Sequence, residues 1–138
     1  AYHLLQKGGY AIFSVMNYES TIANAVNTFN IEDGSNKLLE LSASSTQEKT
    51  GDIFNPEYYL VDTNSHIIYR KEQFSQGTQL PIELIVRDRR FTMHEIIGLC
   101  ESVGFSVVES KYTNASDWNT CYEATNKRAK EILLICKK

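Results

Sequence analysis

The hydrophobic positions near the start of the chain form one dense run. Residues 10–17, YAIFSVMN, are almost continuously apolar, which is typical of a strand buried on both faces in the parallel sheet of an α/β protein. Residues 2–5 resemble the last turn of an amphipathic helix, and Gly8 and Gly9 supply the left-handed stop that ends one. The opening stretch therefore predicts half of a βαβ unit, with the first strand of that unit not in the chain.

From about Thr28 to Arg90 the pattern changes to short β-rich runs separated by polar turn signals such as Asn64-Ser65. These runs predict an antiparallel β meander that is inserted into the α/β frame.

The helical pattern returns at residues 91–113. Thr92 and Glu95 have the spacing of a capping box, apolar side chains then recur on one helical face, and Gly104 ends the helix. Residues 105–112 are predicted to form a strand. The segment that holds Asp117-Trp118-Asn119 is predicted to be a loop, and the terminal EILLICKK a second short buried strand.

Taken in order, these segments resemble a known family. The LLQKGGY turn into a buried strand, the β insertion that ends in RDRRFTMHEI, the helix leading into GFSVVES and the terminal EILLICKK strand resemble the C-terminal half of class I S-adenosylmethionine-dependent methyltransferases. The resemblance spans nearly the whole chain. It rests on the order and spacing of the segments.

The resemblance implies an α/β fold, the C-terminal half of a Rossmann-like methyltransferase sheet with an inserted antiparallel β meander. Residues 1–27 would supply a helix end and the fifth strand, residues 28–91 a substrate-covering insertion, and residues 92–138 a helix and the last two strands. EILLICKK would be the seventh strand, antiparallel and inserted between the fifth strand and the sixth, GFSVVESKYT. The family's glycine-rich cofactor loop and its ribose-binding acidic residue have no counterpart in the chain. S-adenosylmethionine is therefore expected as a cofactor of the full-length parent, and not of this chain alone.

Composition narrows the alternatives. The length of 138 residues predicts one domain. The net charge of -3 disfavours a nucleic-acid-binding surface. No apolar run is long enough to span a membrane. Three cysteines without a CxxC motif favour reduced thiols and a cytoplasmic location.

Candidate substrate-binding residues come from three places in the pattern. Asn17 and Tyr18 follow the first strand at the edge where open α/β sheets bind ligands, although a plain strand end explains them as well. In the insertion, guanidinium groups suit a carboxylate or phosphate, although an exposed ion-paired face is the commoner explanation. Trp118 either covers a substrate or caps the sheet. The complete set of candidates is Asn17, Tyr18, Tyr69, Arg70, Arg87, Arg89 and Trp118.

Other chemistry finds little support. His3, His66 and His94 have no metal-ligand spacing, and no catalytic triad or carboxylate pair is evident, so the catalytic residues stay unassigned. Cys100 lies on the apolar helix face as a small buried hydrophobe.

Two hypotheses follow. The first is the C-terminal portion of a methyltransferase for a small molecule, inactive without its cofactor-binding half. The alternative is a complete non-catalytic partner or protein-binding module, which uses the meander as a protein-binding surface or completes a sheet in trans. The expected partners are a small-molecule substrate and either the missing N-terminal half or a second copy that pairs through the exposed sheet edge.

Overall fold

The structure is a computed structural model that describes residues 1–30, 37, 40–41, 43–45, 55–74 and 82–138. The chain divides into two compact units. Unit 1 combines Ala1–Ala23 with Arg90–Lys138, and unit 2 is Asn24–Arg89. Unit 1 is thus assembled from two stretches of chain that unit 2 separates in the sequence.

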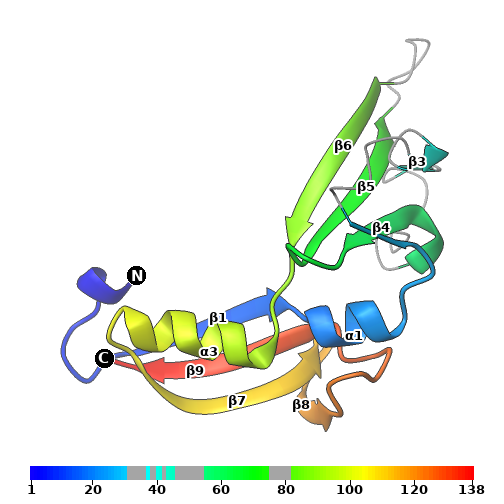
Figure 1. Ribbon diagram of the computed structural model, residues 1–138. Helices are drawn as coiled ribbons and strands as arrows, with labels where there is room; N and C mark the ends of the chain where they lie inside the picture. The colour runs from blue at the N-terminus through cyan, green and yellow to red at the C-terminus, as the bar shows by residue number, and fades with distance from the viewer. Residues whose placement is uncertain (31–36, 38–39, 42, 46–54, 75–81) are drawn as a thin grey trace. The chain divides into compact units, whose positions relative to one another are not determined.

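Unit 1 is built on a sheet with the strand order β1-β9-β7-β8 (Figure 1). Strand β9 (Glu131–Lys137) lies between β1 (Tyr10–Met16) and β7 (Ser106–Asn114) and is antiparallel to both. The terminal strand therefore has the place that the sequence predicts for it. Its apolar run is explained by this central position, since Ile132 and Leu134 are fully buried.

The helix α3 (Met93–Ser102) begins and ends where the sequence predicts. The Thr92 hydroxyl accepts a hydrogen bond from the Glu95 backbone N–H, and a Glu95 carboxylate oxygen accepts one from the Thr92 N–H at 2.8 Å. At the other end Gly104 has a φ of 101°, and the Phe105 N–H donates to the Cys100 carbonyl at 3.1 Å. This is the Schellman arrangement, which accounts for the glycine.

One face of the unit 1 sheet packs against α3. Ile96 and Cys100 of the helix join Ile132, Leu134 and Cys136 of β9 in one buried cluster, which also contains Phe105. The prediction that Cys100 is a buried apolar side chain is confirmed.

The prediction that the first strand is buried on both faces is wrong. The side chains of β1 alternate: Phe13 and Val15 face the α3 side, whereas Tyr10 and Ile12 are 57% and 61% exposed on the opposite side. A continuous apolar run does not reveal which of its faces has a covering layer within the same chain.

The N-terminal residues are tied to the last residue of the chain. The Gly8 N–H donates to the Lys138 carbonyl at 2.8 Å, and the Lys138 ammonium donates to the Leu5 carbonyl at 2.7 Å. Gly8 has a φ of 80°, so the predicted left-handed residue is present, and the predicted helix end is a single 3-10 turn, η1 (Tyr2–Leu4). Tyr2 stacks edge-on against Phe105 with the ring centroids 5.0 Å apart.

Two short elements of unit 1 were not predicted. A helix, α1 (Tyr18–Ala23), follows β1 directly, and β8 (Asp117–Tyr122) occupies the segment predicted as a loop. Strand β8 pairs with β7 through Tyr112↔Tyr122 and Asn114↔Asp117, with an irregularity between the two pairs. A short, exposed strand has little apolar periodicity, so the sequence pattern does not predict it.

Unit 2 holds a second sheet, which is mixed where the sequence predicts a purely antiparallel meander. Strands β4 (Tyr59–Asp62), β5 (Ile67–Phe74) and β6 (Ile82–Arg89) do form antiparallel neighbours. In contrast, β2 (Thr28–Phe29) is parallel to β4, and β3 (Ala43–Ser45) is parallel to β5. Parallel pairing joins segments that are distant in sequence, so local turn signals do not predict it.

Local contacts shape the rest of unit 2. The 3-10 turn η4 (Pro56–Tyr58) precedes β4, and the buried Asp62 closes the β4–β5 hairpin by accepting the Asn64 N–H at 3.1 Å. Phe29, Leu41, Leu60 and Tyr69 form its apolar cluster. In the part of the chain that the structure describes, no helix has both the length and the apolar character needed to cross a bilayer.

Candidate functional site

The carboxyl end of β1 is where polar side chains of unit 1 converge. Asn17 is 1% exposed, and its amide donates to the carbonyls of Ala124 and Ala129, each at 2.8 Å. Its side-chain oxygen accepts the N–H groups of Glu19 and Ser20, which caps the start of α1. The Asn17 side-chain amide therefore forms its hydrogen bonds with the protein's own backbone, and these bonds fix the turn between the strand and the helix.

Tyr18 lies beside this turn and is also buried, at 7% exposed. Its backbone N–H donates to the Phe91 carbonyl at 2.8 Å, and the Phe91 N–H donates to the Met16 carbonyl at 3.0 Å. These bonds join the two sequence stretches of unit 1 at the carboxyl end of β1. Both candidate residues at this strand end, Asn17 and Tyr18, are therefore buried, and the Asn17 amide is bonded to the backbone.

A phenol and a carboxylate meet next to this turn, and the sequence analysis had singled out neither. The Tyr112 hydroxyl donates to Glu19 Oε2 at 2.5 Å, and the Met93 N–H donates to the same oxygen at 3.3 Å. Burial, together with the hydrogen bond to the Glu19 carboxylate, raises the pKa of Tyr112. The phenol is therefore held in its protonated form, and the carboxylate lies at the N-terminus of α3, where the helix dipole favours negative charge.

Two positive residues, Arg90 and Lys130, are also connected to this turn. Arg90 is 3% exposed and donates from Nη1 to Thr21 Oγ1 at 2.6 Å, and that hydroxyl in turn donates to the Asn17 carbonyl at 2.7 Å. Burial, and then the charge of Arg90, lower the pKa of Lys130. Arg90 belongs to the RDRR run in which Arg87 and Arg89 were the predicted residues. It was missed because it lies beyond the last residue of β6, where strand alternation no longer assigns a face.

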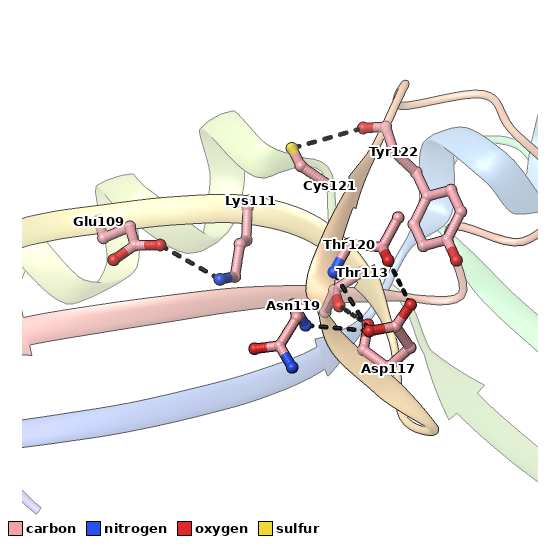
Figure 2. A network of polar contacts seen from close by, with 8 residues as sticks. All are labelled: Glu109, Lys111, Thr113, Asp117, Asn119, Thr120, Cys121 and Tyr122. Carbon is pink, nitrogen blue, oxygen red and sulfur yellow. Dashed lines mark hydrogen bonds and ion pairs between the residues drawn. The ribbon is translucent and has the colours of Figure 1, made fainter.

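Trp118 is part of the exposed hairpin formed by β7 and β8. The indole N–H donates to Glu131 Oε2 at 3.2 Å, and the side chain is 46% exposed. Figure 2 shows how Asp117 organises this hairpin: its carboxylate accepts the backbone N–H groups of Asn119 and Thr120 and the Thr120 hydroxyl. These hydrogen bonds, the Thr120 hydroxyl first, lower the pKa of Asp117. Trp118 therefore lies next to a turn that the hydrogen bonds of Asp117 hold in place.

The predicted residues of unit 2 separate onto two faces of its sheet. Tyr69 and Arg87 are directly paired across β5 and β6, with the guanidinium carbon 5.6 Å from the ring centroid, and Arg89 is paired with Ile67 on the same face. Arg70 lies on the opposite face, because successive residues of a strand alternate.

Arg70 forms a buried ion pair with Glu72. Arg70 Nη2 lies 3.0 Å from Glu72 Oε1, and both side chains are 11% exposed. Arg70 Nε is buried and has no hydrogen-bond partner among the residues that the structure describes. The four insertion residues predicted as one group therefore do not form one site.

Unit 2 also contains a polar cleft of about 480 Å³ that the sequence analysis missed. It lies beside β2 and β4 and is lined by Val26, Asn27, Thr28, Lys37, Glu40, Leu41, Glu57 and Leu60. The cleft depends on the parallel pairing of β2 with β4, so no local sequence signal points to it. Across the part of the chain that the structure describes, no three His, Cys, Asp or Glu side chains are grouped to hold a metal ion.

Comparison with known proteins finds solved structures with a similar fold. No protein-family model and no curated protein matches the chain. Among solved structures, the CcbJ methyltransferase from Streptomyces caelestis matches 97% of this chain with a TM-score of 0.58 at 13% identity. An S-adenosylmethionine-dependent methyltransferase from Clostridium acetobutylicum ATCC 824 matches 98% of it with a TM-score of 0.53 at 12% identity.

The present chain covers 48% and 46% of these two chains, so it spans about half the length of the solved proteins it matches. Similarity at such low identity shows the fold alone. The resemblance predicted from the sequence is confirmed at that level: the chain folds like part of these methyltransferases.

Proposed function

We propose that this chain is the C-terminal portion of an S-adenosylmethionine-dependent methyltransferase and that it acts together with a cofactor-binding half. The observation that carries the proposal is the fold match over 97% of this chain, which accounts for only 48% of the matched methyltransferase. A match of that kind is expected if one portion of such an enzyme is present.

The residues at the carboxyl end of β1 do not fit the cofactor. Open α/β sheets bind dinucleotide-like groups where glycines let backbone N–H groups approach the ligand and a carboxylate holds the ribose. Here the strand passes into α1 without a glycine, and the buried Asn17 side chain already accepts the N–H groups of Glu19 and Ser20. The proposal therefore assigns S-adenosylmethionine to the other half, and no step of methyl transfer is derived from this chain.

We propose a small molecule as the methyl acceptor, with unit 2 as its cover. The cleft of about 480 Å³ in unit 2 has the size of small-ligand pockets, which are on the order of 300–1,000 Å³. The Tyr69–Arg87 pair offers an aromatic ring and a guanidinium on one face. A cytoplasmic location stays a prediction that is consistent with the free thiols of Cys100, Cys121 and Cys136.

The alternative function, a non-catalytic partner that completes a sheet in trans, is favoured by one observation. Strand β1 lies at the edge of its sheet in the described chain, and its Ile12 is 61% exposed. An apolar edge strand is a ready template for pairing with another chain.

Calorimetry with S-adenosylmethionine tests the proposal. The 138-residue chain should show no binding, and the same chain preceded by the residues that its gene encodes before Ala1 should bind the cofactor. Those residues should contain a strand followed by a glycine-rich turn. Tight binding by the 138-residue chain, or no binding by the longer one, would overturn the proposal, and the second result would favour the non-catalytic partner.

A further inference from the structure

Strand β6 of unit 2 carries exposed apolar side chains on both of its faces. In the described chain it pairs along its whole length with β5 and with no other strand (Figure 1). Ile82, Leu84 and Ile85 are 62%, 51% and 48% exposed. Leu84 and Ile85 are consecutive, so their side chains point to opposite faces of the sheet. A layer packed on one face would cover only one of them, whereas a further strand beside β6 would lie against both.

The charged residues of β6 decide which strand fits beside it. Its sequence is IELIVRDR, and natural proteins use such charges to keep unrelated strands from an exposed edge. Glu83 and Arg87 lie on the same face, with three apolar residues between them. An antiparallel strand therefore fits if it places a positive group opposite Glu83 and a negative group opposite Arg87, with apolar residues between. Strand β6 of a second copy has this pattern.

A two-fold axis at Ile85 produces the match. Ile85 then lies opposite Ile85 of the second copy, and Leu84 lies opposite Val86. Glu83 lies opposite Arg87, so that two pairs of opposite charge flank the apolar centre, and such cross-strand pairs stabilise a sheet. Moving the axis to Leu84 would place Glu83 opposite Ile85, and moving it to Val86 would place Ile85 opposite Arg87. The sequence of β6 therefore favours the axis at Ile85.

Arg87 can bind a carboxylate of another chain without leaving its own sheet. Its guanidinium carbon lies 5.6 Å from the centroid of the Tyr69 ring, and the two residues are paired across β5 and β6. A guanidinium that lies over a ring keeps N–H donors along its edge, where a carboxylate can accept two of them. Both Arg87 and Glu83 are exposed. The contact with Tyr69 therefore restricts the cation before a second copy binds, which lowers the entropy lost on binding.

We propose that residues 83–87 of β6 form a dimer interface, in which two copies of the chain pair antiparallel about an axis at Ile85 and join their unit 2 sheets into one. The inference does not depend on the methyltransferase function, and it concerns a different edge from β1. It gives Arg87, offered above as part of a substrate face, a carboxylate of the second copy as its partner.

Disulfide cross-linking tests the register. The variants are made in a Cys121→Ser background, because that native thiol is exposed. Opposed residues of antiparallel strands have Cα atoms about 4.5–5.5 Å apart, which a disulfide can bridge. Ile85→Cys should therefore give a covalent dimer when it is oxidised with copper phenanthroline. Leu84→Cys alone should not, because its two copies are offset by two positions along the strands, whereas a mixture of Leu84→Cys and Val86→Cys chains should give the mixed dimer, identified by mass spectrometry.

Sedimentation equilibrium measures the contribution of the charges. Glu83→Arg should weaken dimerisation by about tenfold or more, because it places like charges opposite each other on both sides of the axis. Adding Arg87→Glu should restore the dimer, since the same pairs form again with their signs exchanged. Glu101→Arg, at an exposed position in α3 of unit 1, makes the same change in net charge and should leave dimerisation unchanged. Circular dichroism checks that each variant is folded.

Three results would overturn the proposal. The first is a native chain that sediments as a monomer at every concentration at which it is soluble. The second is a dimer that Glu83→Arg leaves intact or that Ile85→Cys does not cross-link, because the copies would then associate through another surface. The third is cross-linking of Leu84→Cys alone, which would show a different register. Recovery of the dimer on adding Arg87→Glu supports the interface, because a loss of folding caused by Glu83→Arg would not be reversed in this way.

Discussion

Two glycines near the end of α3 have opposite surroundings. Gly104 has a φ of 101°, and a Cβ placed there would lie 2.9 Å from Cζ of Tyr2. Gly98 is inside the helix, and a Cβ placed there meets nothing within 4 Å. We expect Gly104→Ala to lower the free energy of unfolding by about 1–2 kcal/mol, because a left-handed conformation strains any residue with a Cβ. Gly98→Ala should raise it by about 1 kcal/mol through helix propensity.

Urea denaturation of both variants measures these changes, and a Tyr2→Ala background separates the causes. Removing the Tyr2 ring relieves the contact but not the backbone strain, so Gly104→Ala should remain destabilising there, by a smaller amount. If Gly104→Ala were as stable as the native chain in both backgrounds, the Schellman end of α3 would be refuted.

The Tyr112 phenol makes the folding stability of unit 1 depend on pH in the alkaline range. Its pKa in the folded chain is raised above the ordinary value of 10.0 by burial and by the Glu19 carboxylate. The folded state therefore retains a proton that the unfolded state loses near pH 10. The stability contributed by this proton is complete below that pH and is lost as the pH rises above it. Tyr112→Phe should remove this part of the alkaline loss.

Chemical denaturation at pH 8 and at pH 10.5 tests this expectation. The difference in unfolding free energy between the native chain and Tyr112→Phe should shrink at the higher pH. Tyr10→Phe, on the exposed side of β1, is the matched control and should leave the pH dependence unchanged. A constant difference for Tyr112→Phe would show that the phenol does not titrate differently in the folded state.

Two substitutions in β1 test whether its side chains alternate between a covered face and an exposed face. The sequence did not predict this alternation correctly. Phe13 packs edge-on against Phe105 with centroids 5.6 Å apart, whereas the adjacent Ile12 is 61% exposed. We expect Phe13→Ala to lower the free energy of unfolding by about 2–3 kcal/mol, somewhat less than for a fully buried aromatic side chain because Phe13 is partly buried, and Ile12→Ala to stay within about 0.5 kcal/mol. Thermal unfolding followed by circular dichroism measures both. A comparable loss for the two variants would indicate that something covers the second face in solution.

The elements that the sequence predicted correctly are those whose signals are local. The Thr92–Glu95 capping box and Gly104 fix α3 within a few residues, and the apolar run ILLIC predicts β9 as a buried strand, whereas its place between β1 and β7 was implied by the resemblance to methyltransferases. What failed depends on distant contacts: the parallel pairing of β2 and β3, and the missing cover on one side of β1. The candidate site follows the same rule. Asn17 and Tyr18 were found from a strand end, whereas the Glu19–Tyr112 contact joins residues 93 positions apart.

The division of the chain into two units has a direct consequence for folding. Unit 1 is closed by bonds between its own two stretches: Phe91 pairs with Asn17, and Arg90 donates to Thr21. The chain therefore leaves unit 1 after Ala23 and re-enters it at Arg90, and both positions are next to residues that are in contact. We expect that replacing residues 24–89 with a Gly/Ser linker of about five residues leaves unit 1 folded, since such a linker spans about 10 Å or more.

Fluorescence of the single tryptophan, Trp118, follows unit 1 alone, because that residue lies within it. The shortened chain should keep a cooperative unfolding transition, and Asn17→Ala should lower the unfolding free energy by about 2 kcal/mol or more in both chains, because it leaves buried carbonyls and the start of α1 without their hydrogen bonds. An equal loss in the two chains would show that the β1–α1 turn is organised within unit 1. A shortened chain without a cooperative transition would mean instead that unit 2 is required for unit 1 to fold, and the insertion would then be part of the scaffold rather than an addition to it.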